Sequence, residues 1–77
     1  MKLTYSGLNV AVIGATGAVG AAFLSIAEER KFPIDTLKLL ASARSEGREL
    51  RFRDQIIKVH EVSEKELEGI DLVFCSA

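Results

Sequence analysis

The stretch LNVAVIGATGAVG, at Leu8–Gly20, decides the fold of this 77-residue chain. Its first six residues form a short, mostly apolar run rich in β-branched side chains, which is typical of a strand buried on both faces of a parallel sheet. Its last seven residues place glycine at Gly14, Gly17 and Gly20, a G-x-x-G-x-x-G spacing. The stretch therefore predicts a strand, a tight turn and the start of a helix, in that order.

A helix of about three turns is predicted directly after the glycines. Residues at steps of three and four mark its expected buried face: Val19, Ala22, Phe23, Ile26, Ala27 and, at the end, Arg30. We expect the helix to end at Arg30-Lys31 and Phe32-Pro33. Cations stabilise a helix C-terminus, and the residue before a proline avoids the helical region.

The rest of the chain alternates strand, loop and helix signals. The further elements predicted are a strand at 37–41, a polar loop at 42–47, a β-hairpin of strands 49–53 and 56–62 around Asp54-Gln55, a short helix, and an apolar strand at 70–75. The short helix is predicted from the capping-box pattern of Ser63 and Glu66, with Gly69 as its terminator. The fold class is therefore α/β: a Rossmann-like, doubly wound, mostly parallel sheet with a short β-hairpin insertion.

The composition of the chain excludes several classes of binding partner and site. The chain is 48% hydrophobic and 27% charged, which indicates a folded domain. Ten Lys and Arg against eleven Asp and Glu give a net charge of -1, so we expect neither nucleic-acid nor membrane binding. The single cysteine, Cys75, excludes an internal disulfide and a multi-cysteine metal site. With no apolar signal segment at residues 1–6, the expected location is the cytoplasm.

The three glycines predict a phosphate site. Gly14 would let the chain turn sharply off the strand, Gly17 would let the backbone approach an anion, and Gly20 would let the helix pack closely. The unpaired amides of the first helical turn suit a pyrophosphate, and Thr16 can add a hydroxyl. A Walker motif is excluded because no Lys-Ser/Thr follows the last glycine. Dinucleotide binding is favoured over a purely structural tight turn.

The end of the second strand predicts which dinucleotide is bound. NAD enzymes usually place an acidic residue there to bind the ribose 2′-hydroxyl, but residues 37–45 contain none. Ser42, Arg44 and Ser45 lie there instead, and a guanidinium with two hydroxyls suits a 2′-phosphate. We therefore predict NADP as the cofactor. The alternative is that Arg44 is an ordinary solvated loop residue.

The sheet crevice should open where the strand order reverses, between the ends of strands 8–13 and 70–75. Ser76 is therefore expected to border the cofactor, although it fits equally well as an ordinary strand-end residue. Cys75 is expected to be buried in its strand, and His60 to have a surface or half-buried structural role. No catalytic residue is assigned, because no nucleophile, base and orienting group occur together.

The sequence resembles the aspartate-β-semialdehyde dehydrogenase family. The matching segments, in order, are VAVIGATGAVG (10–20), ERKFP (29–33), LLASARSEG (39–47) and DLVFCSA (71–77). The glycine motif alone occurs in other nucleotide-binding families, but its combination with the F-P turn and the L-A-S-x-R-S-x-G loop is specific.

The resemblance implies an NADP-dependent enzyme that reductively dephosphorylates β-aspartyl phosphate to aspartate semialdehyde, on the route to lysine, threonine and methionine. Family members are homodimers or homotetramers with a C-terminal catalytic and dimerisation domain. By position it assigns cofactor binding to three groups of residues: Thr16, Gly17, Ala18 and Val19 at the pyrophosphate, Ser42, Arg44 and Ser45 at the 2′-phosphate, and Ser76 at the crevice. The cysteine nucleophile, the acid–base histidine and the substrate arginines of the family lie downstream of residue 77.

We expect residues 1–77 to be the N-terminal part of such an NAD(P)-binding domain, because the chain stops where the next crossover should begin. Three alternatives stay open. The chain could begin a family branch that has lost the catalytic residues. It could come from an extended short-chain reductase or epimerase, although these normally lack a hairpin like that at 51–62. It could also be a non-catalytic nucleotide-sensing or interaction module.

Overall fold

The computed structural model describes residues 7–75. Its elements are β1 (Leu8–Ile13), α1 (Ala18–Glu29), β2 (Ile34–Ala41), the 3₁₀ helix η1 (Ala43–Ser45), β3 (Glu49–Phe52), β4 (Gln55–Glu61), the 3₁₀ helix η2 (Lys65–Leu67) and β5 (Leu72–Cys75). Every predicted strand is present, and the polar loop after β2 contains the single turn of η1. No helix within 7–75 is long and apolar enough to cross a membrane.

The five strands form one sheet in the order β3-β4-β2-β1-β5. β1 pairs in parallel with both β2 and β5, and β2 pairs in parallel with β4, whereas β3 runs antiparallel to β4. This confirms the predicted Rossmann-like, mostly parallel architecture. The hairpin of β3 and β4 extends the main sheet rather than standing beside it, because β4 occupies the place next to β2.

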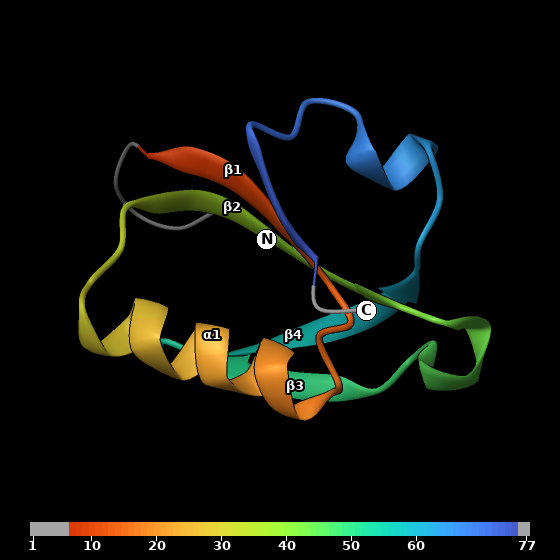
Figure 1. The fold of residues 1–77 in the computed structure, drawn as a ribbon, viewed down its shortest axis with the longest axis horizontal. Coiled ribbons are helices and arrows are strands. Elements are labelled where there is room, and N and C mark those ends of the chain that lie inside the picture. Colours follow the sequence, from red (N-terminus) through yellow and green to blue (C-terminus); the bar gives the residue numbers. More distant parts are fainter. Residues whose placement is uncertain (1–6, 76–77) are drawn as a thin grey trace.

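Two layers cover the sheet, one on each face (Figure 1). α1 lies on one face, and the segment 62–71, which contains η2, crosses the other on the way to β5 (Figure 1). Lys38 marks that second face, because its Nζ lies 2.8 Å from the carbonyl oxygen of Glu66 and 3.3 Å from its Oε1. Ser63 Oγ accepts the predicted hydrogen bond from the Glu66 amide at 3.3 Å, but the N-cap of η2 is Glu64 rather than Ser63, and the short helix is a single 3₁₀ turn.

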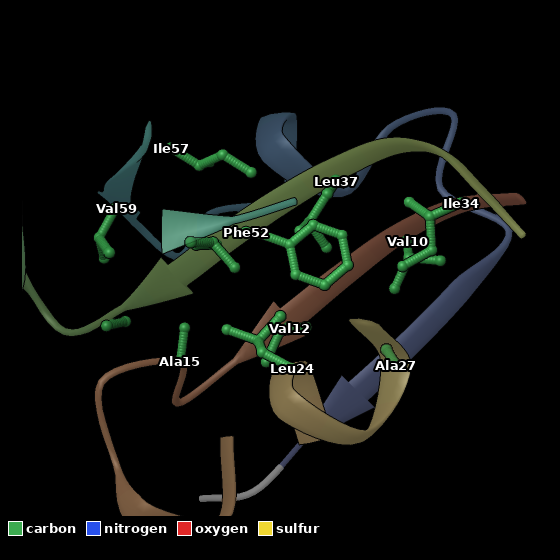
Figure 2. Packing of buried hydrophobic residues seen from close by; sticks show 12 residues of the cluster. Val10, Val12, Ala15, Leu24, Ala27, Ile34, Leu37, Phe52, Ile57 and Val59 are labelled. Carbon is green, nitrogen blue, oxygen red and sulfur yellow. The ribbon is translucent and has the colours of Figure 1, made fainter. Parts of the chain in front are cut away.

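The main core lies between α1 and the sheet. Leu24 and Ala27 point from α1 toward Val10 and Val12 of the sheet, and the ring of Phe52 lies within the same cluster (Figure 2). Phe52 is fully buried, as are Val10 and Val12. The period-two pattern of the hairpin strands therefore buries Phe52 on the α1 side of the sheet.

The buried face of α1 differs from the predicted one. The structure buries Gly20, Leu24 and Ala27, whereas Val19 and Ile26 are more than half exposed. The rotation of the helix is set by Gly20, which lies against the turn at its own N-terminus, and this turns Leu24 rather than Ile26 toward the sheet. Phe23, half-buried, stacks on Phe74 of β5 with ring centroids 4.3 Å apart.

The helix ends where predicted, at Arg30. The Phe32 amide donates to the Ala27 carbonyl at 2.9 Å and the Lys31 amide donates to the Glu28 carbonyl at 3.2 Å, which is the Schellman pattern. Lys31 occupies the left-handed position with φ 54°. β2 then starts at Ile34, earlier than predicted, because the residues directly after Pro33 already pair with β1.

Two further predictions need correction. The hairpin turns at Arg53-Asp54, one residue before the predicted position; both have positive φ, 52° and 64°, as a two-residue type I′ turn requires. Cys75 is exposed rather than buried. β5 is an edge strand of the described sheet and pairs there with β1 alone, so its outer side has no neighbouring strand.

Candidate functional site

A cavity of about 500 Å³ opens at the C-terminal ends of β1 and β2. It is lined by Ile13, Gly14, Thr16, Gly17, Ala18, Val19, Ala41, Ser42 and Val62. Six of the residues predicted to bind the cofactor therefore surround one space. This is the edge of a parallel sheet at which α/β folds bind their ligands.

The turn from β1 into α1 depends on Gly14. Its φ of 84° lies in the left-handed region that side-chain-bearing residues seldom adopt. The amides of Gly14 and Ala15 both donate to the carbonyl oxygen of Leu40, at 2.9 and 3.2 Å, so the turn is fixed to the end of β2. The predicted role of Gly14 is confirmed by this backbone conformation.

Gly20 and Gly17 differ in the space around them. A Cβ on Gly20 would lie 2.5 Å from the Gly14 carbonyl oxygen and 2.9 Å from the Ala15 Cα, so α1 can pack against the turn only because residue 20 has no side chain. A Cβ on Gly17 would meet the Gly14 carbonyl oxygen at 3.5 Å, an ordinary contact. Packing therefore does not require glycine at 17, although Gly17 is also the N-cap of α1, a position at which glycine is preferred over alanine.

The N-terminus of α1 faces the cavity. The first bond within the helix runs from the Ala21 amide to the Gly17 carbonyl at 3.0 Å, so the amides of Ala18 and Val19 precede the first donor of the helix. Gly17 is the N-cap and has no side chain to accept from them, and the first turn has no acidic residue. These exposed amides and the positive end of the helix dipole together suit an anion.

The second predicted group of residues lies in η1 and its flanks. Ser42 lines the cavity, Arg44 is exposed, and Ser45 is half-buried. The hydroxyl oxygens of Ser45 and Thr16 are 3.4 Å apart, so η1 meets the glycine-rich turn directly. Arg44 is outside the cavity lining but belongs to the same short turn as Ser45. Ser76 lies outside the described residues.

The carboxylate of Glu46, directly after η1, is bound by the sheet. Its Oε1 accepts a hydrogen bond from the Glu61 amide at 2.5 Å, and its Oε2 lies 3.1 Å from Nδ1 of His60. The Glu61 amide, and after it the His60 ring, hold the pKa of the Glu46 carboxyl below its ordinary value. His60 is exposed at this contact, in line with its predicted structural role.

Sequence reasoning missed the apolar wall of the cavity, which Ile13, Ala41 and Val62 provide. Ile13 and Ala41 are the last residues of their strands, and that position is a usable signal in any parallel sheet. Val62 could not be predicted from local sequence. It reaches the cavity because its amide donates to the Ala41 carbonyl at 3.0 Å, and the two residues lie far apart along the chain. Neither His60 nor Cys75 lines this cavity.

Comparison with known proteins agrees with the geometry of the site. A family model described as the NAD-binding domain of semialdehyde dehydrogenase matches residues 9–77. Aspartate-semialdehyde dehydrogenase from Legionella pneumophila is 51% identical over 70 residues, which are 91% of this chain and 20% of that protein. A Pseudomonas aeruginosa protein named USG-1 protein homolog is 43% identical over 70 residues, which are 91% of this chain and 21% of that protein.

A solved structure gives the same result at the level of the fold. Aspartate semialdehyde dehydrogenase II from Vibrio cholerae, complexed with ASA, superposes with a TM-score of 0.88 at 44% identity. The match covers 94% of this chain and 24% of that one. This chain spans about a fifth of the length of its curated relatives. The chain belongs to the semialdehyde dehydrogenase family and carries the glycine-rich, NAD(P)-binding part of that family's nucleotide-binding domain.

Proposed function

We propose that this chain is the cofactor-binding part of an NADP-dependent aspartate-semialdehyde dehydrogenase. The reaction is the reductive dephosphorylation of β-aspartyl phosphate to aspartate semialdehyde, in the biosynthesis of lysine, threonine and methionine. The complete enzyme would be a cytoplasmic homodimer or homotetramer, with its catalytic residues beyond these 77 residues. One observation carries the proposal: in a chain of this family, the glycine-rich turn and η1 meet through Thr16 and Ser45 beside one cavity.

The contacts of Glu46 favour NADP over NAD. Glu46 is the first acidic residue after β2 and the nearest candidate for the carboxylate that binds a ribose 2′-hydroxyl in NAD enzymes. Both of its oxygens are engaged by β4, through the Glu61 amide and His60. With this carboxylate engaged, Arg44 and Ser45 are the groups in the turn that remain for a 2′-phosphate.

The residues present fit a dinucleotide. The space over Gly17, which a side chain would reduce, lies beside the helix amides of Ala18 and Val19, and these can hold the pyrophosphate. Ile13 and Val62 form an apolar wall on one side of the cavity. When bound, the nicotinamide supplies hydride transfer. The contribution of this chain is to bind and orient the dinucleotide, which is catalysis by positioning.

The test uses the protein encoded by the complete reading frame that contains this sequence. With aspartate semialdehyde, phosphate and NADP, we expect NADPH to form, and with NAD at equal concentration a much slower reaction. The measurement is the initial rate of reduced-cofactor formation, with a reaction lacking phosphate as the control. Tight NADPH binding without turnover of this substrate would contradict the proposed reaction while leaving the cofactor assignment intact.

A second candidate function is nucleotide binding without dehydrogenase activity. The match to a protein that is not named a dehydrogenase, at 43% identity, shows that this region is also found under another name. The rest of the reading frame decides between the two. The dehydrogenase needs a downstream cysteine nucleophile and a histidine as acid and base, and absence of both would favour the binding protein.

A further inference from the structure

The turn that carries Arg44 is anchored to the sheet by the side chain of Glu46. One carboxylate oxygen accepts from the Glu61 amide at 2.5 Å, and the other lies 3.1 Å from His60 Nδ1. Both partners belong to β4, so the contact joins two segments that the chain separates by a full β-hairpin. Glu46 thus connects the turn at 43–45 to a strand of the sheet.

The backbone bonds of the turn determine mainly its shape, and the bond from the Arg48 amide to the Ser45 carbonyl at 3.1 Å joins it to the residues that follow. The amides of Ser45 and Glu46 donate to the carbonyls of Ser42 and Ala43, which closes the 3₁₀ turn on itself. Bonds from the turn to β4 begin only after it, where the Gly47 amide donates to the Val59 carbonyl at 2.8 Å. Gly47 has a φ of 88°, so the backbone changes direction sharply between the turn and β3. The Glu46 carboxylate therefore helps to fix how the turn is aimed.

The direction of the turn matters because it sets the positions of Arg44 and Ser45. Ser45 Oγ lies 3.4 Å from Thr16 Oγ1 of the glycine-rich turn. A rotation of η1 about its junction with Gly47 would open this contact and move the guanidinium of Arg44 at the same time. Directional hydrogen bonds from a guanidinium to phosphate lose strength steeply as their angle departs from linear.

We propose that Glu46, seated against Glu61 and His60, is a positioning residue that aims the Arg44–Ser45 turn and so sets the preference for a dinucleotide with a 2′-phosphate. This inference rests on the proposed function, because it concerns the same cofactor site. The proposal gives Glu46, an acidic residue, a role in selecting a cofactor whose 2′-phosphate would bind nearby.

Charge repulsion alone and a positioning role predict opposite effects of removing Glu46 on NADPH affinity. A carboxylate near a bound phosphate repels it, so removal of the Glu46 charge should by itself strengthen NADPH binding slightly. A positioning role predicts weaker binding, because the turn would lose its anchor. The sign of the change therefore separates the two roles of Glu46 before its size is considered.

The experiment compares dissociation constants of NADPH, NADH and adenosine 2′,5′-bisphosphate for the protein from the complete reading frame. For Glu46→Ala we expect the constants for NADPH and the bisphosphate to rise by about tenfold, and that for NADH to change by less than about twofold. Glu46→Gln keeps an acceptor for the Glu61 amide and should stay within about threefold of the unaltered protein. His60→Gln, which leaves the Glu61 contact in place, should raise the NADPH constant by about two- to threefold.

Glu49→Ala is the matched control. Glu49 is an exposed acidic residue at the start of β3, and its replacement removes the same charge without touching the Glu46 contacts. It should leave the ratio of the NADPH and NADH constants unchanged. Melting curves identify a temperature at which all variants are folded, and a ratio of two affinities measured there is insensitive to a general loss of stability.

The outcomes separate this inference from the proposed function. If the unaltered protein binds NADPH no better than NADH, the NADP assignment itself fails. If it prefers NADPH and Arg44→Glu removes the preference, but Glu46→Ala binds NADPH as tightly as before or more tightly, only the positioning role of Glu46 is overturned. If Glu46→Ala does not fold, the Glu46→Gln and His60→Gln variants decide: a ratio of the NADPH and NADH constants that is unchanged in both would contradict the inference.

Discussion

Replacement of Arg44 by glutamate is expected to raise the dissociation constant for NADPH by about a hundredfold while that for NADH changes by less than about threefold. Arg44 is exposed in η1, and the next residue, Ser45, contacts Thr16 of the glycine-rich turn through their hydroxyl groups. A charge-assisted pair with a 2′-phosphate would be lost and replaced by repulsion, whereas NADH has no phosphate at that position. Titration of the intrinsic fluorescence of either reduced cofactor measures both constants.

Arg48→Glu provides the control for net charge. Arg48 is exposed just beyond the turn, and the same change of charge there should weaken NADPH binding by less than about fivefold at physiological salt. Equal losses for NADPH and NADH in Arg44→Glu would show that Arg44 supports the fold of the turn or contacts the shared part of the cofactor. The prediction of NADP as the preferred cofactor would then be wrong.

The strands and the glycine-rich turn could be predicted because their signals are local. An apolar run that ends at Gly14 implies both a buried strand and its end, and the Gly14 φ of 84° shows the conformation for which glycine was expected. The hairpin is equally local, since alternation at 49–62 fixes which side chains face the core. For such segments the decisive contacts lie within a few residues along the sequence.

The orientation of α1 could not be predicted in the same way. Val19 and Ile26 lie on an apolar stripe, but the sheet contacts the neighbouring stripe that contains Leu24. The rotation follows from the contact of Gly20 with the turn at Gly14, a fact about the distance between two backbones. Hydrophobic periodicity shows that a helix has an apolar face, but here that face is wide and only its edge is buried against the described sheet.

Some residues of the candidate site could be predicted from local sequence motifs, and others could not. Six of the residues that line the cavity belong to the glycine-rich turn or directly follow β2, and these local motifs predict a binding site. The contacts of Glu46 with β4 and the approach of Val62 to the cavity depend instead on the pairing of β4 with β2. A hairpin signal does not specify which strand the hairpin will join, or in which direction. Residues that reach a site through such pairing are therefore seen only in three dimensions.

Alanine at Gly20 is expected to destabilise the fold, whereas alanine at Gly17 is expected to spare it. The Cβ at 20 would lie 2.5 Å from the Gly14 carbonyl oxygen, and the turn cannot move away easily because the Gly14 amide is bonded to Leu40. Overpacking of up to about 3 kcal/mol exceeds the gain of about 1 kcal/mol in helix propensity, so the free energy of unfolding should fall by about 2 kcal/mol. Urea unfolding followed by circular dichroism measures this change.

Gly17→Ala is the matched variant, since the same methyl group at 17 meets only the Gly14 carbonyl oxygen, at 3.5 Å. Its free energy of unfolding should fall by no more than about 1 kcal/mol, the cost of alanine at the N-cap of α1. Its dissociation constant for NADPH should nevertheless rise at least about tenfold, because the methyl group occupies the approach to the helix amides of Ala18 and Val19. Unchanged NADPH affinity in a stable Gly17→Ala protein would mean that the pyrophosphate does not bind at this turn. Stability and binding would thus be assigned to different glycines of one motif, Gly20 to packing and Gly17 to the ligand.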